Sequence, residues 1–130
     1  MRGQAAMEFL ALLGVAAAML AVFSLVSFER QQELHREEIA GAGRLVCRRI
    51  AFEANSAAAV GDGFEHEFVL PLQLEHSQDY SVEVIGAERA VLVDWGFGSC
   101  RLPLVASRFA GSPSKGENEV SNQGGVVVFG

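Results

Sequence analysis

An uncharged stretch of 20 residues, from Phe9 to Phe28, lies near the start of this chain of 130 residues. As a helix rising about 1.5 Å per residue, it is long enough to cross the roughly 30 Å hydrocarbon core of a bilayer. So small a protein has too little chain to cover such a helix on every side. The stretch therefore predicts a transmembrane helix, with the carboxylate of Glu8 at its entrance.

The flanks of this stretch differ from those of a cleaved secretory signal. Such a signal has a basic leader, about 7–15 apolar residues and a small-residue cleavage site after them. Here the apolar run is longer, a carboxylate stands at its start, and SFERQQELHREE follows without such a site. A cleavage site before the apolar stretch fits better, where Arg2, Gly3 and Gln4 precede AAMEFL.

The stretch RGQAAMEFLAL resembles the class III signal peptides of archaeal type IV pilin-like proteins. Their pattern is a Gln, a small residue two positions later, a Glu and then a Leu. The resemblance implies a cut between Gly3 and Gln4 by a prepilin peptidase. Gln4 would then be the first mature residue, Glu8 the fifth and Leu12 the ninth. The family usually has Ser where this chain has Ala6.

The resemblance also implies a function, that of a structural subunit of a type IV pilus-like surface filament. The precursor would span the cell membrane once, with its N-terminus in the cytoplasm and its head outside. Processed subunits would leave the lipid and polymerise on the cell surface through the apolar helix. The implied partners are further copies of the chain, the prepilin peptidase, a pilus assembly ATPase, membrane platform proteins and, before assembly, membrane lipid.

Glu8 has two readings that the sequence leaves open. A carboxylate next to hydrocarbon is costly and is usually paired or functional. In a bundle of staggered helices, Glu8 of one subunit would neutralise the new amine of Gln4 in another, so that Gln4, Glu8 and Leu12 form an assembly site. Alternatively, Glu8 lies at the level of the lipid headgroups, where its negative charge stabilises the positive N-terminal end of an uncleaved helix.

Residues 29–60 predict an amphipathic helix that continues the apolar one. Apolar residues recur at intervals of three and four, the spacing of one helix face. They are Ile39, Ala42, Val46, Ile50 and Ala57, with Leu34 and Leu45 adjoining. Gly41 and Gly43 weaken a helix by up to about 1 kcal/mol each, which allows a bend there.

Residues 61–130 predict a β-rich head, because the apolar period changes to two after the GDG at 61–63. In FEHEFVLPLQLEH the alternation indicates two strands or one bent strand, interrupted at Pro71. YSVEVIG, RAVLVDW, SCRLPLV and GGVVVFG follow as short strands, and AGSPSKGEN at 110–118 is expected to be a loop. Trp95 and Phe97 are expected in the core, with an exposed contact at a strand end as the alternative. The fold class is therefore α+β: a long N-terminal helix packed by a small antiparallel sheet of four to six strands, as in type IV pilins.

Cys47 and Cys100 lie too far apart for a metal motif, and outside the cytoplasm a disulfide between them is expected. No catalytic motif, cofactor fingerprint or metal-ligand spacing occurs, and His35, His66 and His76 are expected on the surface. Residues 61–130 hold ten acids against four bases, which supplies the net charge of -6 and argues against nucleic-acid binding.

The sequence thus divides into a leader (1–3), a transmembrane or filament-core helix (4–28), an amphipathic stem (29–60) and an extracellular head (61–130). Two other functions stay open. The chain is also compatible with a minor pilin or adhesin-type subunit, and with a single-pass anchored binding module that never assembles. An enzyme is not expected.

Overall fold

The computed structural model describes residues 2–130, which form two compact units that divide between Arg36 and Glu37. The first unit is helical throughout. The second contains the rest of helix α1 (Arg2–Val60) and all of the strands. The predicted long N-terminal helix is confirmed, and it continues without interruption through Gly41 and Gly43. The fold is α+β, as expected.

The helix ends where the sequence predicts. Gly61 has a φ of +92° and donates its backbone N–H to the carbonyl of Ala57, an arrangement typical of a helix C-terminus. The buried side chain of Asn122 donates a second hydrogen bond of 2.9 Å to the same carbonyl. The last turn is therefore held by a strand far along the chain as well as by its own glycine.

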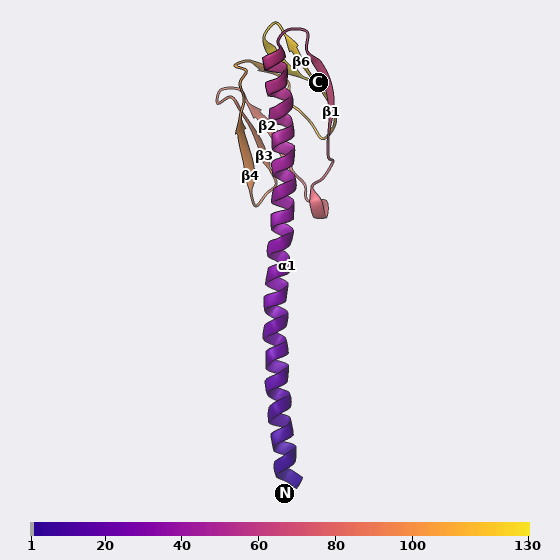
Figure 1. The fold of residues 1–130 in the computed structure, drawn as a ribbon, viewed down its shortest axis with the longest axis vertical. Coiled ribbons are helices and arrows are strands. Elements are labelled where there is room, and N and C mark those ends of the chain that lie inside the picture. Colours follow the sequence, from indigo (N-terminus) through magenta and orange to yellow (C-terminus); the bar gives the residue numbers. More distant parts are fainter. Residues whose placement is uncertain (1) are drawn as a thin grey trace. The chain divides into compact units, whose positions relative to one another are not determined.

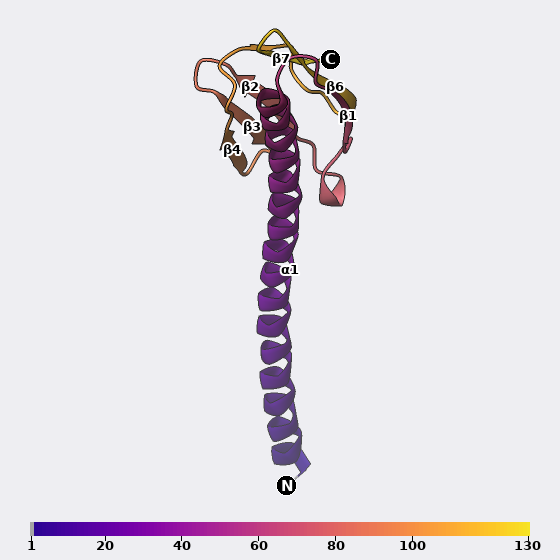
Figure 2. The same ribbon diagram turned by 45° about the horizontal axis from the view of Figure 1, so that its top comes forward.

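Seven strands follow the helix, in two sheets. The strands are β1 (Glu65–Leu70), β2 (Ser81–Ile85), β3 (Ala90–Asp94), β4 (Ser99–Pro103), β5 (Phe109–Ala110), β6 (Gly116–Gln123) and β7 (Val126–Phe129). One sheet has the order β1-β6-β7-β5 and the other the order β2-β3-β4. Both views place β2, β3 and β4 on one side of the helix and β1 and β6 on the other (Figures 1 and 2).

The expectation of one antiparallel sheet was wrong in two respects. There are two sheets, and the first is mixed, because β5 pairs with β7 in parallel. The physical reason is the width of the buried stripe on the helix. Residues from Ile39 to Ala57 are buried over several directions around the axis, which one small sheet does not cover.

The break at Pro71 is confirmed, but no strand follows it directly, and the boundary of one loop differs from the prediction. β1 stops at Leu70, because Pro71 has no N–H for the ladder, and the following residues lead into a short 3-10 turn, η1 (Glu75–Ser77). The expected loop at 110–118 ends early, since β6 begins at Gly116. Glu117 and Glu119 point outward while Asn118 and Val120 are buried, so the alternation of a half-buried strand was present but masked by its polar composition.

The core of the second unit combines the helix stripe with both sheets. Ile50, Val91 and Val120 come from α1, β3 and β6 respectively, and none of them is exposed. Trp95 is buried as expected, but Phe97 is 49 % exposed and does not belong to the core. Leu34 and Leu45, which adjoin the predicted stripe, are also exposed.

Trp95 packs against the helix at Gly43. A Cβ atom at Gly43 would lie only 2.4 Å from Cε3 of the indole, and a Cβ atom at Gly98 would approach the other part of the ring at 2.9 Å. The helix therefore needs a residue without a side chain at position 43. At Gly41, by contrast, a Cβ atom would meet nothing within 4 Å.

These two glycines give a matched test of the packing. Gly41→Ala should raise the free energy of unfolding by up to about 1 kcal/mol, since Ala is the better helix former. Gly43→Ala should instead lower it, by about 1–3 kcal/mol, because the methyl group displaces the indole. Urea unfolding of the full chain in a non-ionic detergent, followed by Trp95 fluorescence, measures both. Equal stabilisation by the two substitutions would contradict the contact.

Candidate processing and assembly site

The first unit is an apolar helix with no cover. Its most apolar 18-residue window has a mean hydropathy of 2.6, and none of that window is buried. By length and composition this helix could cross a membrane. Large side chains such as Phe9, Leu12 and Phe23 are all more than half exposed. Contiguous apolar surface of this kind marks contact with lipid or with other protein.

The predicted processing and assembly residues lie in the first three turns of α1. The side-chain amide of Gln4 donates a hydrogen bond of 3.4 Å to the carboxylate of Glu8. Leu12 follows one turn later and is exposed, so the three residues share one helix face at a spacing of four. The structure thus brings together the polar pair that the sequence singled out, with an apolar side chain next to it.

Gly3 has no packing reason to be glycine. A Cβ atom there would meet nothing within 4 Å, and its φ is not in the left-handed region. The Gly3–Gln4 bond lies in the first turn, where backbone N–H groups have no acceptor within the helix. Packing within the described chain therefore places no requirement for glycine at position 3.

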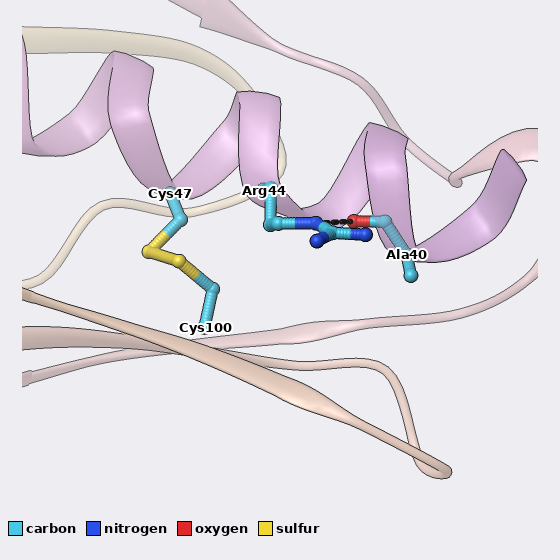
Figure 3. Close-up of a disulfide and its surroundings, with 4 residues drawn as sticks. All are labelled: Ala40, Arg44, Cys47 and Cys100. Atoms are coloured by element: carbon cyan, nitrogen blue, oxygen red, sulfur yellow. Dashed lines mark hydrogen bonds between the residues drawn. A yellow bond between two sulfur atoms is a disulfide. The ribbon is translucent and has the colours of Figure 1, made fainter. Parts of the chain in front are cut away.

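The disulfide predicted between Cys47 and Cys100 is confirmed. It joins the buried face of α1 to β4, with a Cα–Cα distance of 6.2 Å (Figure 3). One turn before Cys47, Arg44 lies on the exposed side and donates from Nε to the carbonyl of Ala40 at 3.2 Å. The bond closes a loop of 53 residues. In the chain-entropy description such a loop stabilises the fold by about 4 kcal/mol.

Removal of this bond tests its energetic role. The double variant Cys47→Ala, Cys100→Ala should unfold with a free energy lower than that of the oxidised wild type by about 4 kcal/mol. Urea unfolding of the full chain in detergent measures the difference. Reduced wild-type protein is the matched control, because it keeps both sulfur atoms. If oxidised and reduced wild type unfold at the same urea concentration, the bond does not stabilise this fold.

Two histidines contact carboxylates of the helix, which the sequence did not reveal. Nδ1 of His66 lies 2.8 Å from Oε2 of Glu53, and Nε2 of His76 lies 2.6 Å from Oε2 of Glu38. Glu53 is 2 % exposed, and Nε of Arg49 lies 2.9 Å from its other oxygen. A buried carboxylate needs such partners. Both histidines are exposed, as expected, and each also contacts a carboxylate of α1.

These contacts do not assemble into a metal centre. Among residues 2–130 no group of three or more His, Cys, Asp or Glu side chains lies close enough together to hold an ion. His66 and Glu53 tie β1 to α1, and His76 and Glu38 tie the η1 turn to α1. Their arrangement is one of pairwise links between elements.

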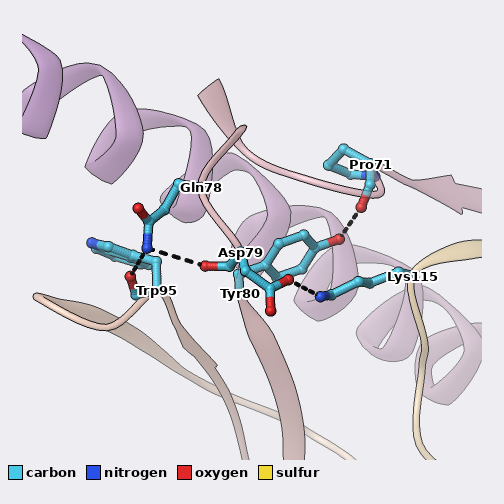
Figure 4. Close-up of polar contacts among 6 residues, drawn as sticks. All are labelled: Pro71, Gln78, Asp79, Tyr80, Trp95 and Lys115. Carbon is cyan, nitrogen blue, oxygen red and sulfur yellow. Dashed lines mark hydrogen bonds and ion pairs between the residues drawn. The ribbon is translucent and has the colours of Figure 1, made fainter. Parts of the chain in front are cut away.

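A polar network around Tyr80 holds the segment between β1 and β2 (Figure 4). The hydroxyl of Tyr80 donates to the carbonyl of Pro71, and the amide of Gln78 donates to the carbonyl of Trp95 at 2.7 Å. Lys115 pairs with Asp79 and lies 5.2 Å from the Tyr80 ring centroid. The hydrogen bond and charge of Lys115 lower the pKa of Asp79. Burial, and then the charge of Asp79, raise the pKa of Tyr80.

The raised pKa of Tyr80 has a measurable consequence. The stabilisation from the neutral hydroxyl is complete below the unfolded pKa of about 10 and is lost as pH rises through the folded pKa. Tyr80 is the single tyrosine of the chain, so phenolate absorbance reports on it alone. We expect the pKa of Tyr80 to be higher in the folded protein than in the urea-unfolded protein. Tyr80→Phe should cost about 1 kcal/mol near pH 7 and flatten the alkaline loss of stability. Coincident titration curves would contradict the burial effect.

Comparison of the chain with protein-family models, with curated proteins and with solved structures finds no match.

Proposed function

We propose that this protein is a pilin-like structural subunit of a surface filament, of the kind formed by archaeal type IV pilins. One observation carries the proposal. The first unit is an uncovered apolar helix whose single acid before position 29, Glu8, stands at its start in contact with Gln4. A stable soluble protein does not leave such a helix bare, so it must lie in lipid, against other helices, or in each in turn.

Processing and assembly follow from the same segment. A prepilin peptidase cuts between Gly3 and Gln4, and the new amine of Gln4 lies about 6 Å along the axis from Glu8. Within one helix Glu8 already accepts a hydrogen bond from the side chain of Gln4. In a staggered bundle, Glu8 of one copy neutralises the amine of the next. This pairing is favoured in apolar surroundings, where an unpaired charge is costly.

The rest of the helix supplies close packing. Transmembrane helices associate through small residues, because lipid gives no hydrophobic driving force between helices. Small residues in the apolar stretch include Ala11, Gly14, Ala16, Ala17, Ala18 and Ala21. Moving the apolar helix from lipid into a bundle of identical helices then changes its hydrophobic free energy very little. The assembly ATPase and membrane platform proteins supply the directed work, and the filament lies on the cell surface.

Mass spectrometry of the mature N-terminus and electron microscopy of sheared surface material test this function together. We expect a chain that begins at Gln4 and is found in filaments. Glu8→Ala should still be inserted and cut, but should reduce filament yield by at least about tenfold, since the amine loses its partner. Glu29→Ala, which removes an acid beyond the apolar stretch, is the matched control and should leave the yield unchanged.

Two results would contradict the proposal. Normal filaments from Glu8→Ala would remove the role of the ion pair. Mature chains that keep Met1 and occur singly in the membrane would favour an anchored binding module that does not assemble.

A further inference from the structure

The second unit presents an uncovered face of helix α1 on the side away from its own sheets. Arg44, Arg48 and Phe52 are exposed at a spacing of four, and Leu45 is exposed beside them. We name these four residues the outer helix face. Leu45 and Phe52 are each 66 % exposed. The buried residues Ile39, Val46 and Ile50 lie on the opposite side of the helix.

Positive charge on this face is unbalanced within the chain. Glu53 is the only acid between Ile39 and Val60, and it is buried against Arg49 and His66. Arg44 donates to a backbone carbonyl, and in the described chain neither Arg44 nor Arg48 pairs with a carboxylate. Two large apolar side chains thus lie between arginines that have no acidic partner.

The first sheet presents a face of opposite charge. Glu65, Glu67 and Val69 of β1 point outward together with Glu117 and Glu119 of β6, and we name these five residues the outer sheet face. Glu67 stands directly opposite Glu119 in the ladder, and Val69 opposite Glu117. Like charges opposite each other destabilise a sheet. Within residues 2–130 none of these four carboxylates has an ion-pair partner.

The outer sheet face also has room for an apolar side chain. A hollow of about 480 Å³ is lined by Glu67, Val69, Glu117 and Glu119, among others. Val69 is 67 % exposed at this place. An occupant that suits this surface therefore carries positive charges around one or two apolar side chains.

We propose that the outer helix face of one copy docks on the outer sheet face of a second copy. Arg44 and Arg48 then pair with carboxylates that repel one another in the single chain, while Leu45 and Phe52 contact Val69 and the hollow beside it. Two different patches of the same chain form a heterologous contact, which generates open helical assemblies. The inference rests on the proposed function, because it names a head contact of the same homopolymer.

Charge reversal with exchange of partners tests this contact. The sheet variant is Glu67→Lys, Glu119→Lys, and the helix variant is Arg44→Glu, Arg48→Glu. Each full-length variant is compared with wild type by sedimentation in a non-ionic detergent that covers the apolar helix. We expect each variant alone to self-associate at least about tenfold more weakly, since like charges then face each other. An equimolar mixture should regain association, because the reversed faces attract.

Salt dependence and a control variant complete the experiment. Wild-type association should weaken between about 0.15 M and 1 M salt, as the screening length falls from about 8 Å to 3 Å. Glu83→Lys reverses an exposed carboxylate on β2, away from both faces, and should associate like the wild type. A cooperative urea transition followed by Trp95 fluorescence shows that each variant is folded.

Failure of this contact is separable from failure of the proposed function. A mixture that associates no better than its components overturns the contact, and so does undiminished association of either variant. Loss by the helix variant alone also overturns it, because the outer helix face would then dock on a different patch of the second copy. Filaments and cleavage at Gly3 are scored on wild-type cells, so the proposed function can stand while the contact fails.

Discussion

Within the second unit, one stripe of helix α1 packs against the two sheets, and the rest of that unit depends on this contact. Ile50 and Cys47 on this stripe are completely buried, and the two sheets lie on either side of it. A three-stranded sheet such as β2-β3-β4 needs a partner for its apolar face to be stable. The helix is that partner, and the disulfide, Trp95 against Gly43, and Asn122 on the helix C-terminus all hold the sheets to it.

The polar contacts of the second unit serve the same end. Glu53, Asn122 and Tyr80 are buried, and each is paired with a group from another part of the chain. A buried polar group that loses its partner destabilises the fold by more than a formed hydrogen bond stabilises it. Each of these residues therefore specifies one arrangement of its neighbours. Each of these residues connects two segments of the second unit.

Several apolar and charged surfaces have no partner within the described chain, and they lie on its outside. The apolar helix of the first unit is uncovered. In the second unit, Arg44, Arg48 and the glutamates of the outer sheet face have no ion-pair partner among residues 2–130. In a monomer these features cost solubility and electrostatic free energy. The proposed homopolymer would cover the apolar helix and would pair these charges between neighbouring copies.

Much of the fold was predictable from the order of the residues alone. The long helix and its end follow from three local features, because hydrophobic period and backbone freedom are local properties. These features are the uncharged stretch from Phe9 to Phe28, the spacing of Ile39, Val46 and Ile50, and the glycines after Val60. The same holds for β2, β3 and β7. The strand β6 was hidden by its polar residues, and the role of Glu53 was hidden because its partner His66 lies on another element. The apolar stripe of α1 was foreseen, but its covering by two sheets was not. The contact that requires glycine at position 43 and the charges that stay unpaired were likewise decided only in the tertiary structure, since burial and pairing depend on residues that are distant in the sequence.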